Sequence, residues 1–147
     1  MDGAELELER RSKFLSSLIQ KKKAIEQQEK TERLNIKVRA SDMPLALQNK
    51  AFKCARDLLD YMPGKLDSKR LALALKKEFD STYGPAWHCI VGTSFGSYVT
   101  HSLGGFLYFS IDKISILKLH VQLQGAELIN MSINVDSSDI RVVFAEY

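Results

Sequence analysis

The sequence contains few of the residues that build disulfide frameworks, metal sites and membrane spans. Among its 147 residues there are two cysteines and three histidines. Cys54 and Cys89 form no metal or redox spacing, so we expect two buried, reduced thiols. No apolar run is long enough to cross a bilayer, and the charged stretch from Asp2 to Lys13 is unlike a secretory signal. These absences favour an ordinary globular protein that needs no membrane.

Residues suited to catalysis are present, but they form no recognisable constellation. His88 and Cys89 are neighbours in an expected strand, so their side chains point to opposite faces and cannot act as a nucleophile and its base. The stretch from Gly92 to Ser97 lacks the Gly-Lys-Ser/Thr ending of a phosphate-binding loop and leads into a strand. Glu78 and Asp80 lie on a charged helix face. We therefore expect no enzyme activity, no metal site and no cofactor.

The overall composition is balanced. Hydrophobic residues make up 45% of the chain and charged residues 27%, which is typical of soluble domains. The formal net charge of +3 is too small to indicate nucleic acid as a partner. A chain of 147 residues favours one domain with a single core.

Residues 1–33 predict a charged helical extension. After Gly3 this region has no glycine or proline, and it is rich in Glu, Lys, Gln and Leu, which favour helix. Four apolar residues have partial heptad spacing, but basic residues interrupt the seam and argue against a stable coiled coil. The apolar positions are Leu8, Leu15, Leu18 and Ile25, and the interruptions are Arg11 and Lys22.

Residues 34–119 predict a folded domain that begins with a short strand and two helices. Leu34, Ile36 and Val38 alternate with polar residues, as in a strand. Ser41 or Asp42 is expected to cap the first helix, with Pro44 in its first turn and Pro63-Gly64 at its end. Its expected buried face consists of Met43, Leu47, Ala51, Cys54, Leu58 and Met62.

The second helix is expected to begin at a cap formed by Asp67 or Ser68 and to end at Gly84-Pro85. It should point Leu71, Leu75 and Phe79 into the core.

From Trp87 onward the hydrophobic period changes to two. Strands are expected over 87–91, 95–101, 106–111 and 114–119, with a tight turn at Asp112-Lys113. The extension at 120–147 predicts further strands at 128–135 and 140–144, joined by 136–139. The order predicts an α+β fold, in which two helices pack on an antiparallel β-sheet.

The segment from Gly92 to His101 has features that suit addition of an extended peptide. Gly92 and Gly96 allow another backbone to approach closely, and aromatic residues lie nearby. Backbone hydrogen bonds would then give affinity, and alternate side chains would enter pockets. A bulged inner strand of an ordinary sheet explains the same residues.

A long motif in this region resembles the signature of the dynein light chain type 1 family. The resemblance covers about residues 36–119. It rests on Lys76-Lys77-Glu78-Phe79-Asp80, Tyr83, Pro85, Trp87-His88-Cys89-Ile90-Val91-Gly92, Phe95-Gly96-Ser97-Tyr98-Val99-Thr100-His101, Phe106 and Tyr108-Phe109.

The resemblance implies a homodimer in which each subunit lends the strand 95–101 to its partner's sheet. It also implies a cytoplasmic, microtubule-associated adaptor. Partner peptides, including a segment of a dynein intermediate chain and other short linear motifs, would lie between that strand and the second helix. Two such grooves in one dimer would join two disordered chains. The N-terminal helix and the C-terminal β extension lie outside the resemblance.

The resemblance assigns roles to residues by position. Lys69 would contact a polar side chain of the peptide, typically glutamine. Phe95, Tyr98, Phe106 and Tyr108 would wall the pockets, and Gly96, Ser97, Val99, Thr100 and His101 would supply the edge or the floor of the groove. At the dimer interface it places His88 on the axis, with Phe95, Ser97, Tyr98 and Val99.

The chain departs from the family pattern in several places. Thr93-Ser94 replaces a basic residue and asparagine, and Ser110 replaces a tyrosine near the groove. The link at Gly104-Gly105 permits a tight intrachain hairpin as an alternative to strand exchange. The second functional hypothesis is a fixed structural subunit, which the long helix and the extra strands dock permanently into one complex, with unused grooves.

The C-terminal extension contains a further resemblance. Ile133-Asn134-Val135-Asp136 is similar to one class of peptide that the family captures, with asparagine in the glutamine position. A weak self-ligand is one interpretation; pairing of residues 128–135 elsewhere on the sheet is the other.

Overall fold

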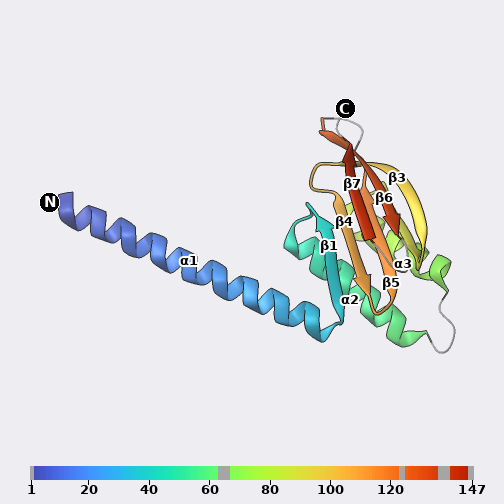
Figure 1. The fold of residues 1–147 in the computed structure, drawn as a ribbon, viewed down its shortest axis with the longest axis horizontal. Helices are drawn as coiled ribbons and strands as arrows, with labels where there is room; N and C mark the ends of the chain where they lie inside the picture. Colours follow the sequence, from blue (N-terminus) through green and yellow to red (C-terminus); the bar gives the residue numbers. More distant parts are fainter. Residues whose placement is uncertain (1, 63–66, 123–124, 136–139, 146–147) are drawn as a thin grey trace. The chain divides into compact units, whose positions relative to one another are not determined.

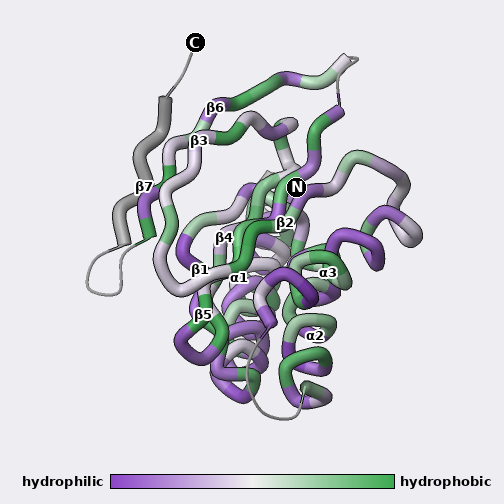
Figure 2. Tube along the Cα trace, turned by 90° about the vertical axis from the view of Figure 1, so that its right-hand side faces the viewer, coloured by the Kyte–Doolittle hydropathy of each residue, from purple (hydrophilic) through white to green (hydrophobic). Residues whose placement is uncertain are grey.

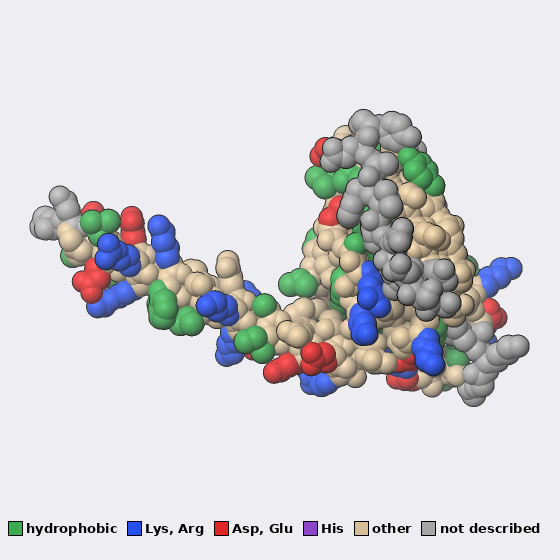
Figure 3. All heavy atoms as spheres, in the orientation of Figure 1, with side chains coloured by type: hydrophobic (Ala, Val, Ile, Leu, Met, Phe, Trp, Pro, Cys, Tyr) green, Lys and Arg blue, Asp and Glu red, His purple; other side chains and the backbone are tan. Residues whose placement is uncertain are grey.

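The computed structural model describes residues 2–62, 67–122, 125–135 and 140–145, and it divides the chain into two units at Arg33 and Leu34. The first unit contains α1 (Asp2–Arg33), the expected N-terminal helix. Hydrophobic and charged side chains are interspersed along α1 (Figure 3). Its apolar residues at heptad spacing, Leu8, Leu15, Leu18 and Ile25, are exposed.

The second unit has two helices and two antiparallel sheets (Figure 1). The helices are α2 (Leu45–Tyr61) and α3 (Ser68–Tyr83). The first sheet has the order β1-β4-β5-β2 and consists of β1 (Ile36–Ser41), β4 (Phe106–Ile111), β5 (Ile114–His120) and β2 (Trp87–Gly92). The second has the order β3-β6-β7 and consists of β3 (Phe95–Ser102), β6 (Leu128–Val135) and β7 (Ile140–Ala145).

The four-stranded sheet forms the middle of three layers (Figure 2). Successive side chains of β4 and β5 point to opposite faces, and most of them are apolar. One face therefore packs on α2 and α3, and the other packs on β3 and β6. This two-sided burial explains why 106–111 and 114–119 are largely apolar on both faces, whereas the sequence predicted a hydrophobic period of two from Trp87 onward.

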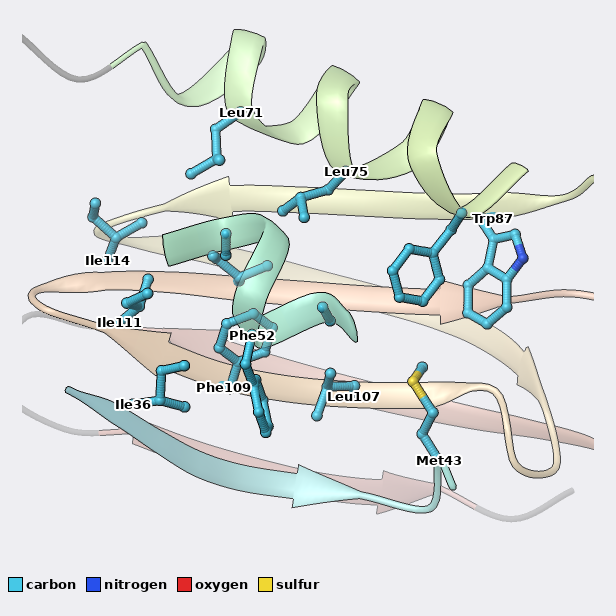
Figure 4. Packing of buried hydrophobic residues seen from close by; sticks show 14 residues of the cluster. Ile36, Met43, Phe52, Leu71, Leu75, Trp87, Leu107, Phe109, Ile111 and Ile114 are labelled. Atoms are coloured by element: carbon cyan, nitrogen blue, oxygen red, sulfur yellow. The ribbon is translucent and has the colours of Figure 1, made fainter. Parts of the chain in front are cut away.

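The helix-side core contains most of the residues that helical spacing predicted (Figure 4). Leu71, Leu75 and Phe79 of α3 are fully buried, and Asp67 caps the helix by accepting a hydrogen bond from the backbone N–H of Arg70 at 3.1 Å. Gly84 ends α3 with a φ of 86°, a left-handed conformation that favours glycine. These predictions are confirmed.

The predicted cap of α2 is wrong, and Pro44 is the N-cap residue, where the sequence predicted a place in the first turn. Ser41 is the last residue of β1, and neither it nor Asp42 caps the helix, which begins after Pro44. The carboxylate of Asp42 instead accepts hydrogen bonds from the backbone N–H groups of Gly104 and Phe106, both at 2.9 Å. One donor in the link between β3 and β4 and one at the first residue of β4 therefore bind this side chain in place of the helix.

The predicted face of α2 is displaced by one position. Met43 and Ala51 are buried as expected, but Phe52 and Ala55 are the other fully buried residues of the helix. The remaining predicted residues, Leu47, Cys54, Leu58 and Met62, are half-buried and pack against the core. Ala51 and Ala55 have short side chains, so the helix can approach the sheet while Phe52 fills the space against Phe109. The end of α2 at Pro63-Gly64 lies outside the described residues.

The strand predictions from Trp87 onward are confirmed, including the two-residue connection at Asp112-Lys113 and the two C-terminal strands. The link 136–139 lies outside the described residues. At the start of the domain Ile36 is buried but Val38 is exposed, and the pairing of β1 with β4 shifts register between Val38 and Ala40.

The Gly104-Gly105 link does not produce a hairpin, because β3 and β4 belong to different sheets. Gly105 lies close to β5. A Cβ atom built on it would be 2.9 Å from the Cβ of His120 and 3.0 Å from the carbonyl oxygen of His120. The link therefore requires a residue without a side chain at this position.

We predict that Gly105→Ala destabilises the second unit by about 1–3 kcal/mol, because backbone atoms must move to admit the methyl group. Urea unfolding followed by the fluorescence of Trp87, the one tryptophan of the chain, measures this change. Gly96→Ala is the control, since a Cβ there meets its nearest neighbour, Oδ1 of Asn134, at 4.0 Å. Equal stability of the two variants would contradict the close approach.

Candidate functional site

The candidate site is built around β3, which takes no part in the four-stranded sheet. In the described residues its strand partner is β6, which runs antiparallel to it over the full length of both strands. The register pairs Phe95 with Val135 and Ser102 with Leu128. β3 is the terminal strand of its sheet, so its other edge is not used in either sheet.

An apolar floor lies beneath this pair of strands. It consists of Phe106 and Tyr108 of β4 with Leu117 and Leu119 of β5, all buried. Inward side chains of β6 cover it: Met131, Ile133 and Val135 are exposed by 2% or less. Phe95 and Val99 of β3 pack against the same cluster. The arrangement is a sheet edge beside an apolar surface.

The structure brings together some of the residues that the resemblance assigns to peptide binding. Alternation places Phe95, Ser97, Val99 and His101 on the inner face of β3. Phe106 and Tyr108 are below them, in the same cluster as Phe95 and Val99. Gly96, Tyr98 and Thr100 lie on the outer face, and Tyr98 is 57% exposed. Tyr98 therefore does not contribute to the floor within this chain.

Two other assigned residues lie away from β3. Lys69 is exposed near the start of α3, which packs against β2 on the helix side of the four-stranded sheet. A single chain does not bring Lys69 to β3. His88 is exposed on β2, with the same orientation as Ile90, on the side of the second cluster.

His101 closes one end of the inner face. It is buried, and its Nδ1 donates a hydrogen bond to the carbonyl oxygen of Ser102 at 2.8 Å. Its ring stacks on Phe106 with centroids 4.8 Å apart, and Asp42 lies 4.0 Å from Nδ1. The histidine thus packs as part of the wall.

Two polar atoms near the floor have no hydrogen-bond partner among the described residues. They are Oγ of Ser97 and the hydroxyl oxygen of Tyr108, both buried. Ser97 lies directly opposite Ile133, whose side chain is a hydrocarbon. A buried hydroxyl without a partner costs about 1–3 kcal/mol.

The thiols are unsuited to nucleophilic chemistry. Burial raises the pKa of Cys89 to about 11, and burial also raises the pKa of Cys54. Both are therefore protonated at neutral pH. In the part of the chain that the structure describes, no group of three or more His, Cys, Asp and Glu side chains could hold a metal ion.

Lys118 is a buried charge that the sequence patterns did not identify. It lies on β5 opposite Cys89 and faces the helix side. Its Nζ donates to the carbonyl oxygen of Leu75 at 2.8 Å and lies 3.8 Å from the ring centroid of Phe79. Burial lowers the pKa of Lys118 to about 8. It is a structural feature of the helix-side core and does not contact β3.

Among the described helices, none combines the length and hydrophobicity that crossing a bilayer requires.

Comparison with known proteins identifies the domain. The profile of the family "Dynein light chain type 1" matches residues 35–118. The protein "Dynein light chain 1, cytoplasmic" of Candida glabrata is 44% identical over 80 residues, which are 54% of this chain and 90% of that protein.

Two solved structures of the dynein light chain-like domain of the Fasciola hepatica calcium-binding protein FhCaBP2 have the same fold. They align with TM-scores of 0.51 and 0.50 at 24% identity. The alignments cover 60% and 59% of this chain and 93% and 91% of those domains. The match to the family profile spans more than half of the sequence and contains α2, α3 and nearly all of β1–β5. The chain belongs to the dynein light chain type 1 family.

Proposed function

We propose that the chain is a non-catalytic adaptor that dimerises and binds extended partner peptides by adding them as a strand to β3. One observation carries the proposal. Within residues 35–118, which match the family, β3 has no place in the sheet, and its strand partner β6 comes from outside that region. The family domain thus presents a strand edge and an apolar floor that a segment from elsewhere fills.

The proposed dimer uses two further strand edges. β2 and β3 are both terminal strands of their sheets. A two-fold axis would allow β3 of each subunit to pair with β2 of the other, and such an interface is self-complementary. This exchange would also place β3 beside the partner's α3, where Lys69 lies.

The proposed partners are a dynein intermediate chain and other proteins with short linear motifs, and the proposed location is the cytoplasm, on microtubules. The name of the Candida glabrata relative, a cytoplasmic dynein light chain, supports a place in a dynein complex. Assemblies without a motor are equally compatible with a dimer that joins two disordered chains.

The second candidate is a fixed structural subunit whose peptide groove is never used. The occupation of β3 by β6 favours this alternative, because a permanently filled edge accepts no other strand. Measured affinity for an external peptide distinguishes the two functions.

We predict that Lys69→Glu weakens binding of a Thr-Gln-Thr peptide by about tenfold or more, because a charge-assisted hydrogen bond contributes about 1.5–3 kcal/mol. Isothermal titration calorimetry measures the affinity. Lys77→Glu, an equal charge change at an exposed position of the same helix, is the control.

A second peptide tests strand addition itself. Methylation of its central backbone nitrogens removes hydrogen-bond donors without changing any side chain. Strand addition requires that this peptide bind much more weakly. Equal affinity for both peptides, or no binding to any form of the folded chain, would rule out capture by strand addition.

A further inference from the structure

We propose that β6 is a built-in ligand of β3, which outside peptides must displace before they bind. The inference rests on the proposed function, since it concerns the same edge and the same floor. It names a regulatory element, residues 128–135, that lies beyond the region matched by the family.

β6 pairs with β3 over the full length of both strands. All eight residues of β6 have a partner on β3, from Leu128 opposite Ser102 to Val135 opposite Phe95. An outside strand cannot form backbone hydrogen bonds on that edge while β6 occupies it. β3 has two edges, so occupation of one leaves the other for exchange with a second subunit.

β6 has one buried apolar face and one polar outer face. Met131, Ile133 and Val135 are buried on the floor, whereas Asn134 is exposed and lies opposite Gly96. On the outer side, the hydroxyl of Thr100 donates to Oδ1 of Asn130 at 2.5 Å. Apolar side chains in pockets and polar side chains outside are the pattern of a bound extended peptide.

The fit of β6 to β3 and the floor is incomplete. Opposite Ile133, the hydroxyl of Ser97 is buried without a partner among the described residues, as is that of Tyr108 near the same cluster. A cavity of about 280 Å³ also remains beside His101, Phe106, Ile129 and Met131. A peptide with a hydroxyl or amide side chain in the place of Ile133 would supply the missing hydrogen bond. The structure thus favours polar-centred peptides as competitors.

A short connection tethers β6 to β5. β5 ends at His120 and β6 begins at Leu128, and both ends of the connection are fixed: the N–H of Val121 donates to Ala86 and that of Leu103 donates to Glu127, at 3.1 and 2.9 Å. A segment held this way acts at an effective concentration on the order of millimolar. A weak internal ligand can therefore set a threshold for outside partners.

The test uses the full chain and a Thr-Gln-Thr peptide. Ile133→Glu places a charge on the apolar floor and should release β6, so affinity for the peptide should rise about tenfold or more, since the competent state is no longer a minor fraction. Asn134→Glu introduces the same charge at the next, exposed position and should leave affinity within about twofold of the native value.

A second variant locks β6 in place without disturbing the floor. Thr100 and Asn130 are directly opposed on the outer face, so Thr100→Cys with Asn130→Cys should form a cross-strand disulfide under oxidised glutathione. Oxidation should weaken peptide binding at least about tenfold, and reduction should restore it, whereas the native chain should respond to neither.

The outcomes separate the two proposals. The native chain, Ile133→Glu and both redox states of the locked chain could all bind the peptide equally. That result would overturn the proposal that β6 occupies β3, and it would leave the proposed peptide binding intact. Retained binding in the oxidised, locked chain would overturn the occupation of β3 by β6 as well. Absence of binding in all forms would remove the proposed function, and with it this inference.

Discussion

Replacing Phe109 with alanine is expected to destabilise the second unit by about 3–5 kcal/mol, the largest change among the substitutions considered. Phe109 is fully buried on β4 between the helices and the sheet. Its ring meets Phe52 of α2 edge to face, with centroids 5.1 Å apart. The substitution removes apolar contact, leaves a cavity in the helix-side core and breaks the aromatic pair.

Urea unfolding monitored by Trp87 fluorescence measures this loss, because Trp87 lies in the same core. Tyr61→Ala is a matched control, since Tyr61 is 83% exposed and its truncation should change stability by about 0.5 kcal/mol or less. In a double-mutant cycle, Phe52→Ala with Phe109→Ala should reveal a coupling of about 0.5–1.5 kcal/mol. A loss below about 1 kcal/mol for Phe109→Ala would contradict the described packing.

Local patterns were sufficient to predict the elements of this fold. The inward face of α3, its cap at Asp67 and its end at Gly84 depend on interactions within a few residues, which the sequence displays directly. The strands from Trp87 onward were also predictable, because alternating and continuous apolar runs reflect burial on one or both faces. The order of these elements then predicted the α+β architecture.

Interactions between distant segments were less predictable. Asp42 looked like a helix cap, but its carboxylate binds the backbone around Gly104, some sixty residues away. Phe52 was missed because short alanines at positions 51 and 55 shift the buried face of α2. The burial of Lys118 was not predicted, because nothing in its sequence neighbourhood reveals that its ammonium group contacts the carbonyl oxygen of Leu75 and the ring of Phe79.

The pairing of β6 with β3 shows the same limit at the candidate site. The β-branched residues of 128–135 indicated a strand, and two interpretations remained open: a weak self-ligand of the groove, or pairing elsewhere on the sheet. The structure selects β3, because the floor of Phe106, Tyr108, Leu117 and Leu119 needs an apolar cover that α2 and α3, on the other face, do not supply. The extension beyond the family domain thus completes the second layer of its core.

Lys118 makes the stability of the chain depend on pH in the mildly alkaline range. Burial lowers its pKa to about 8 in the folded chain, against an ordinary value of 10.5, because the charged form loses its hydration. Between these values the unfolded chain binds more protons than the folded chain, so the free energy of unfolding rises with pH. The cost of burying the charge is complete below about pH 8 and disappears as the pH approaches 10.5.

Cys89 acts in the opposite direction at higher pH. Its pKa is raised by burial from 9.0 to about 11, so the stability that it contributes is present below pH 9 and is lost as the pH rises toward 11. The two effects overlap above pH 9. From pH 7 to 9 the contribution of Lys118 predominates, and comparison with a variant that lacks this lysine separates it from the small opposing contributions of Cys89 and Cys54, since burial raises the pKa of both thiols.

We expect the free energy of unfolding of the native chain to increase by about 1 kcal/mol from pH 7 to 9, and we expect Lys118→Met to abolish this increase. Methionine fills a similar volume and carries no charge, so the variant should be at least as stable as the native chain at pH 7, despite losing the hydrogen bond to Leu75. Urea titrations at both pH values, under reducing conditions, measure the difference. Lys77→Met, which removes an exposed lysine from α3, should retain the native pH dependence. If the native chain and Lys118→Met respond equally to pH, the ammonium group of Lys118 is not desolvated in the folded chain, and its burial against Phe79 does not hold in solution.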